Sequence, residues 1–119
     1  MSIVDSRDNL SLALKSKQNK IVINDKKIVK NLKLLNNIDI KTSDRNRCKY
    51  TIKNKIADSA FLGSIGFAPM ISGIANISFL QGIGIISSIG LNEILIIFSY
   101  YSIYYEKETI ILNKIEKSN

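Results

Sequence analysis

The feature that most constrains this chain is a long stretch with almost no charge. From Ser59 to Tyr105, Glu93 is the single Asp, Glu, Lys or Arg residue. One helical crossing of a bilayer needs about 20 apolar residues at a rise of 1.5 Å per residue. The stretch is long enough for two crossings and a short turn. We therefore predict a transmembrane helical hairpin over residues 57–105, with spans at Ser59–Phe79 and Ile83–Ile103.

The part of the chain before this stretch is strongly basic. The first 58 residues hold 14 Lys and Arg against 6 Asp and Glu, and the whole chain has a net charge of +7. Because Lys49, Lys53 and Lys55 closely precede the first span, we expect them at the membrane surface, with both termini in the cytoplasm. A basic segment can also bind nucleic acid, but the adjacent apolar stretch favours a lipid bilayer as the partner.

The basic part is predicted to form a very small α+β cap over residues 20–56, preceded by a flexible segment at 1–19. Lys20–Ile23 alternates as a strand does. The following Asn24-Asp25 pair is either a hairpin turn or the start of a helix capped by Asp25 and reaching residue 36, and the helical spacing of the apolar residues favours the helix.

A second β-hairpin is predicted at the end of the cap. Residues 38–40 and 48–53 both alternate apolar with polar residues, and a turn-rich segment separates them. The cap is close to the size at which a core needs outside support, so we expect it to lean on the membrane or on a partner.

Small side chains recur along both predicted spans and suggest how the spans pack. Small residues let helix backbones approach closely inside a bilayer. The predicted helix-packing residues are Ala60, Ser64, Ala68 and Ser72 on the first span and Gly84, Ser88 and Asn92 on the second. Composition alone is the alternative explanation, because Gly and Ser are common in membrane helices.

Pro69 and Glu93 are each twelve residues from Gln81 and would lie near the middle of the bilayer. Pro69 predicts a kink, and a carboxylate at that depth needs a polar partner. Self-association of the protein is the simplest source of that partner. In the alternative, Asn92 caps a separate helix with Glu93 in its first turn, which would shorten the second span.

The end of the second span is predicted from its aromatic residues, which are typical of a membrane interface. The interfacial residues are Tyr100, Tyr101, Tyr104 and Tyr105. Residues 106–119 mix apolar with charged residues at helical spacing, and we expect an amphipathic helical tail there.

Several classes of enzyme are excluded by composition. The chain has no His and a single Cys, Cys48, which removes His-based acid–base catalysis and almost every zinc site. No phosphate-binding loop or pair of catalytic carboxylates is visible. No catalytic, cofactor-binding or metal-binding residue is therefore predicted, and we expect a protein that is not an enzyme.

The expected fold is mainly α, a two-span membrane hairpin with a small basic cap. The first functional hypothesis is an oligomerising integral membrane protein that permeabilises a membrane, as pore-forming, lysis, toxin or defence proteins do. The second is a membrane-anchored adaptor or accessory subunit whose basic cap binds a cytosolic partner. A charge-free stretch also fits a buried or reversibly inserting helical hairpin, which would need polar outer faces on its helices.

Overall fold

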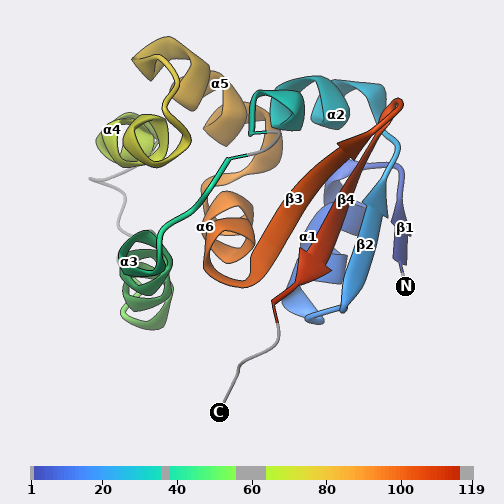
Figure 1. Ribbon diagram of the computed structural model, residues 1–119, viewed down its shortest axis with the longest axis horizontal. Helices are drawn as coiled ribbons and strands as arrows, with labels where there is room; N and C mark the ends of the chain where they lie inside the picture. The colour runs from blue at the N-terminus through green and yellow to red at the C-terminus, as the bar shows by residue number, and fades with distance from the viewer. Residues whose placement is uncertain (1, 36–37, 56–63, 116–119) are drawn as a thin grey trace.

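The computed structural model describes residues 2–35, 38–55 and 64–115 and shows a four-stranded sheet packed against helices (Figure 1). Along the chain the elements are β1 (Ser2–Val4), α1 (Arg7–Lys15), β2 (Lys20–Ile23), α2 (Lys26–Leu32), the short 3₁₀ helix η1 (Lys33–Leu35), α3 (Thr42–Lys53), α4 (Ser64–Ala75), α5 (Phe79–Ile89), α6 (Leu91–Tyr100), β3 (Tyr101–Glu106) and β4 (Thr109–Lys114).

The strands lie in the order β1-β2-β4-β3, so β2 and β4 pair in the middle of the sheet. β1 and β2 are parallel and are joined through α1. β4 lies antiparallel to both of its neighbours, with Ile21 opposite Leu112 on one side and Ile103 opposite Leu112 on the other. The C-terminal hairpin thus closes on a strand near the N-terminus.

Burial alternates along the strands and identifies the covered face of the sheet. Ile21, Ile23, Ile103, Ile110 and Leu112 are buried, because successive strand residues point to opposite faces and these five share one. This face joins the helices in a single hydrophobic core.

Three helix starts are capped by the side chains that such positions favour. Ser6 accepts a hydrogen bond from the Asn9 amide at α1, and Asp25 accepts one from the Ile28 amide at α2. At α5, Ser78 and Gln81 bond each other reciprocally in a capping box. These bonds satisfy amide groups that have no partner within the helix.

The predicted mainly helical two-span hairpin is wrong, because residues 101–114 form β3 and β4 in an α+β fold. Gly90 also separates α5 from α6, so Ile83–Ile103 is not one helix. Among the described residues, no single helix is both long and apolar enough to cross a membrane. The predicted location as a two-span membrane protein is wrong for the same reason.

The basic part matches its prediction in some places and differs in others. Strand Lys20–Ile23 and the helix capped by Asp25 are present, whereas the predicted hairpin over residues 38–53 is wrong, because α3 occupies Thr42–Lys53. Residues 1–19, expected to be flexible, contain β1 and α1. The tail, expected to be helical from residue 106, contains β4.

Gly90 occupies a backbone conformation that other residues rarely adopt, with φ of +107°. A Cβ there would also lie 2.0 Å from Oε1 of Glu93. We expect Gly90→Ala to lower the free energy of unfolding by about 1–2 kcal/mol. Gly84 provides the control, because a Cβ there meets nothing within 4 Å, and Gly84→Ala should raise stability by up to about 1 kcal/mol. Guanidinium denaturation measures the change in the free energy of unfolding for each variant. Equal changes would contradict the break between α5 and α6 at Gly90.

Candidate functional site

The uncharged stretch forms two helices joined at a sharp bend. We call α4, α5 and the turn between them the elbow, and residues 76–81 the elbow tip. No Asp, Glu, Lys or Arg occurs from Ser64 to Asn92. α4 from Gly66 and α5 together have the length and hydropathy of a membrane span, but they are bent by 107° at the break between them. A broken span, a re-entrant loop and a pair of core helices all share that combination, and Ile71, Ile85 and Ile89 are buried in the core here.

The turn of the elbow is closed by its own hydrogen bonds. Asn76 has a φ of +56°, and the Ile77 amide donates to the Ser72 carbonyl oxygen at 3.0 Å, which is the Schellman arrangement at the end of a helix. The Ser78 amide donates to Oε1 of Gln81 at 2.9 Å, and the Gln81 amide donates to Oγ of Ser78 at 3.2 Å. The bend therefore leaves few backbone donors unpaired.

The two helices of the elbow approach closely at a glycine. A Cβ added to Gly82 would lie 3.2 Å from the carbonyl oxygen of Ala68 and 3.5 Å from Cβ of Ser72. Ala68 and Ser72 are thus the predicted small residues that the structure brings into contact with α5. Their neighbour there is Gly82, whereas a Cβ added to Gly84 would have nothing within 4 Å.

The outer surface of the elbow is apolar at its tip. Leu80 is 76% exposed and Phe79 is 44% exposed. Met70, Ile74 and Ile77 are partly buried and pack against the hydrophobic core. No charged residue lies in this part of the chain, and the exposed residues of the tip also include the polar Asn76, Ser78 and Gln81. The exposed Phe79 and Leu80 make the tip the candidate site of contact with another molecule.

The other predicted packing residues lie in different places. Ala60 lies outside the described residues, and Ser64 begins α4. Ser88 is half-buried on α5, and Asn92 is exposed on α6. Pro69 lies inside α4 and is exposed, and its carbonyl oxygen accepts a hydrogen bond from Ser72.

Glu93 lies in the first turn of α6, where a carboxylate faces the positive end of the helix dipole. Its carboxylate accepts a hydrogen bond from Oγ of Ser11 at 3.1 Å. The N-cap is Gly90, not the Asn92 of the sequence-based alternative. With no two-span hairpin present, Glu93 and Pro69 do not share a depth in a bilayer.

The four predicted interfacial tyrosines are divided between the core and the surface. Tyr101 is buried, and its hydroxyl donates to the Gln18 carbonyl oxygen at 2.7 Å. Tyr104 is 52% exposed on the uncovered face of β3. Tyr100 and Tyr105 are half-buried beneath the ammonium groups of two lysines, Lys49 and Lys33 respectively, at 5.2 and 5.6 Å. The four tyrosines therefore do not form a single aromatic cluster of the kind found at a membrane interface.

The predicted basic residues Lys49, Lys53 and Lys55 lie in α3 and just after it. Lys53 and Lys55 are exposed, whereas Lys49 is half-buried beside Tyr100. Cys48 on the same helix is buried, and burial raises the pKa of its thiol to about 11. This thiol is protonated and unreactive near neutral pH.

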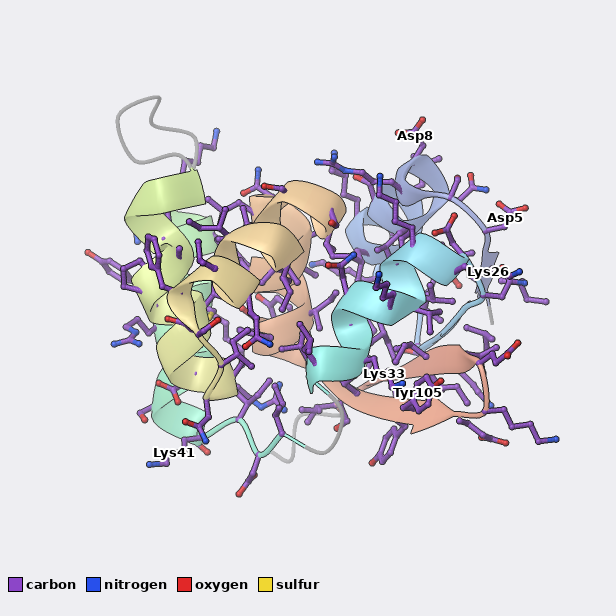
Figure 2. The ribbon with its side chains drawn as sticks, turned by 90° about the horizontal axis from the view of Figure 1, so that it is seen from above. Asp5, Asp8, Lys26, Lys33, Lys41 and Tyr105 are labelled. Carbon is purple, nitrogen blue, oxygen red and sulfur yellow. The ribbon has the colours of Figure 1, made fainter. Side chains whose placement is uncertain are left out.

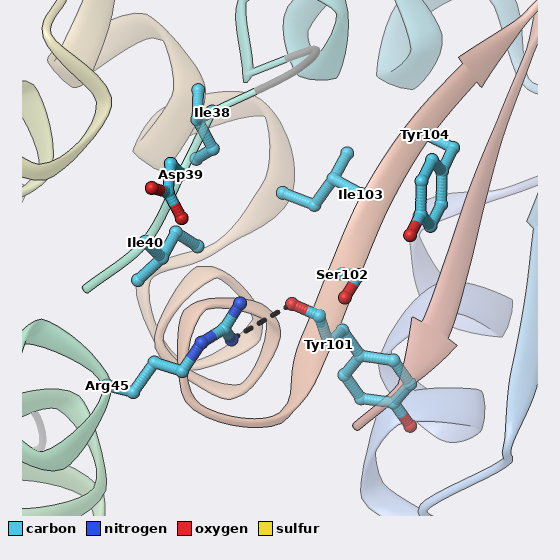
Figure 3. A pocket seen from close by; sticks show the side chains of 8 residues that line it. All are labelled: Ile38, Asp39, Ile40, Arg45, Tyr101, Ser102, Ile103 and Tyr104. Atoms are coloured by element: carbon cyan, nitrogen blue, oxygen red, sulfur yellow. Dashed lines mark hydrogen bonds between the residues drawn. The ribbon is translucent and has the colours of Figure 1, made fainter. Parts of the chain in front are cut away.

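A small cavity of about 240 Å³ lies between β3 and the segment before α3 (Figure 3). Its charged wall includes Arg45, whose Nη1 donates to the carbonyl oxygens of Phe98 and Tyr101 at 2.9 and 3.0 Å. Burial lowers the pKa of Arg45 from its ordinary value, and nearby Asp39 opposes this effect. Because the guanidinium already binds the end of α6, we assign Arg45 a structural role.

The described residues contain no group of three or more His, Cys, Asp or Glu that could hold a metal ion. In comparisons with known proteins, no family, no curated protein and no solved structure matches this chain.

The exposed tip of the elbow was not predicted from the sequence. The predicted first span ends at Phe79, and Leu80 lies between the two predicted spans. The Ser78-x-x-Gln81 capping box was the available signal, because it marks the start of a new helix at Phe79.

Proposed function

We propose that this chain is a non-enzymatic lipid-binding protein that inserts the elbow tip into one leaflet of a bilayer and thereby perturbs it. The observation that carries the proposal is the exposure of Leu80 and Phe79 at the tip of an uncharged pair of helices. This insertion needs no helix that spans the membrane, so it differs from the two-span arrangement that the fold contradicts.

Hydrogen bonds within the tip lower the cost of placing it in a bilayer, compared with a loop whose backbone groups have no partners. Lipid offers no partner for a backbone amide, so a segment that enters it must satisfy its own polar groups. The amides of Ile77, Ser78, Gln81 and Gly82 have partners within the elbow, whereas those of Phe79 and Leu80 belong to the first turn of α5, where amides have no partner within the helix.

The size of the apolar tip predicts weak and reversible binding. Full burial of a Leu or Phe side chain contributes about 1.5–3 kcal/mol, and both side chains are already partly covered. We estimate that they contribute roughly 2 kcal/mol together on insertion, a factor of about 30 in partitioning. A contribution of this size is easily measured by vesicle flotation.

The double variant Phe79→Ser/Leu80→Ser tests the proposal with vesicles of mixed phosphatidylcholine and phosphatidylglycerol. We expect its partitioning into the vesicles to fall by about 30-fold, and release of a trapped dye to fall with it. Leu12→Ser is the matched control, because Leu12 is 65% exposed on α1, away from the elbow. Its binding should equal that of the unmodified chain, and circular dichroism checks that each variant is folded.

Two results would overturn the proposal. One is failure of the unmodified chain to float with vesicles at any lipid concentration. The other is an equal loss of binding in the double variant and in Leu12→Ser, since the elbow tip would then have no special role.

A further inference from the structure

We infer that the lysines of α2 bind anionic phospholipid headgroups and give the elbow its preference for negatively charged bilayers. This inference rests on the proposed function and names the class of lipid that the same surface selects. It comes from the position of α2 beside the elbow and from the charge of its exposed side.

α2 is an amphipathic helix with a basic outer side. Ile28, Val29 and Leu32 are buried against the core. The exposed residues of α2 and η1 are Lys26, Lys27, Lys30, Lys33 and Leu34. Leu34 is 39% exposed, so the outer side carries an apolar residue as well as four lysines. Since the apolar side of α2 is buried in the protein, its exposed lysines are the groups that can reach an anionic headgroup.

α2 lies directly beside the elbow. It packs against α5, and Figure 1 shows α4, α5 and α2 along the same side of the molecule. In Figure 2, which looks onto that side, the three helices lie next to one another, with Lys26 at the start of α2 and Lys33 in η1. A flat bilayer that receives the elbow tip would therefore also approach α2.

The charge on α2 is available to an external anion. The acidic residue next to the helix, Asp25, binds the Ile28 amide as the N-cap. Within the described parts of the chain, the one ion pair shorter than 4.0 Å joins Arg47 to Asp44 on α3. Lys26, Lys27 and Lys30 are exposed and take no part in it.

An apolar tip and a basic helix together supply the two contributions that stable attachment to a membrane needs. One short apolar group gives only marginal binding, and a basic patch beside it strengthens the attachment to anionic lipid. Each lysine near an anionic surface contributes roughly a factor of five to binding. A nucleic acid would use the lysines but would leave the apolar tip and Leu34 unburied.

The triple variant Lys26→Gln/Lys27→Gln/Lys30→Gln tests the inference in the full-length chain. Binding to vesicles with phosphatidylglycerol should fall by roughly 100-fold at low salt, and binding to pure phosphatidylcholine should not change. High salt should weaken binding of the unmodified chain to the anionic vesicles, because exposed charges are screened.

The matched control is Lys15→Gln/Lys17→Gln/Lys20→Gln, which removes the same charge from exposed positions near the end of α1. It should lose much less binding than the α2 variant. Equal losses in the two variants would contradict the inference, because only net charge would then matter. Tighter binding to a 20-nucleotide RNA than to anionic vesicles would also overturn it.

The outcomes separate this inference from the proposed function. If the α2 variant binds anionic vesicles as the unmodified chain does, while Phe79→Ser/Leu80→Ser does not, the elbow proposal stands and the α2 inference fails. If no variant and no vesicle composition shows binding, both are wrong.

Discussion

Replacing Phe98 by alanine is expected to lower the free energy of unfolding by about 3–5 kcal/mol. Phe98 is 0% exposed in the last turn of α6, so its truncation removes buried apolar area and leaves a cavity. A loss of this size is a large part of the stability of a domain, which is about 5–15 kcal/mol. Chemical denaturation followed by circular dichroism measures it.

Phe79→Ala is the matched control for this prediction. Phe79 is 44% exposed at the start of α5, and its truncation should lower stability by less than about 1 kcal/mol. Similar losses at both positions would contradict the burial of α6 in the core. The comparison also tests whether α6 is a core helix. Truncating Phe98 lowers the free energy of unfolding strongly only if its side chain packs inside the protein.

Replacing Arg45 by methionine has the second largest expected effect. The Arg45 guanidinium joins α3 to the end of α6 through hydrogen bonds to the Phe98 and Tyr101 carbonyl oxygens. Loss of these charged hydrogen bonds leaves two partly buried acceptors without this donor. We expect the free energy of unfolding to fall by about 2–3 kcal/mol, measured by the same denaturation experiment.

Arg47 on the same helix provides a close control for Arg45. Its side chain is 57% exposed and lies 3.7 Å from Asp44, an arrangement that contributes at most about 1 kcal/mol. Arg47→Met should therefore be nearly neutral. Equal effects of the two substitutions would show that Arg45 does not connect α3 to α6.

Local signals were enough to predict β2 and the helix that begins with α2. Lys20–Ile23 alternates apolar with polar residues, and Asp25 is a strong N-cap before apolar residues at helical spacing. Both signals depend on neighbouring residues only. α3 was missed because its apolar face is narrow: Cys48 and Thr51 are its buried residues, three apart.

The C-terminal hairpin had a readable pattern that a competing interpretation obscured. Tyr101 and Ile103 are buried at a spacing of two, as in a strand with one covered face. The cluster of tyrosines was instead interpreted as a membrane interface. The second strand of the hairpin, β4, pairs with β2, which lies about 90 residues earlier in the chain, and no local pattern specifies a pairing over that separation.

The largest error concerns the charge-free stretch, because lipid and a protein core impose the same composition. Ile94, Leu95, Ile97 and Phe98 lack charge because α6 is buried in the core. Phe79 and Leu80 are just as apolar but lie at the surface. Composition does not separate these two cases. Only the fold distinguishes the buried helix α6 from the exposed elbow tip.

The most direct test of elbow insertion places a single tryptophan at the elbow tip, since the chain has no Trp of its own. Leu80→Trp should shift its emission to shorter wavelength with anionic vesicles and should be quenched by lipids brominated on their acyl chains. Leu12→Trp on α1 should keep the emission of an indole in water. Emission from Leu80→Trp that neither shifts nor is quenched at saturating lipid would contradict insertion of the elbow.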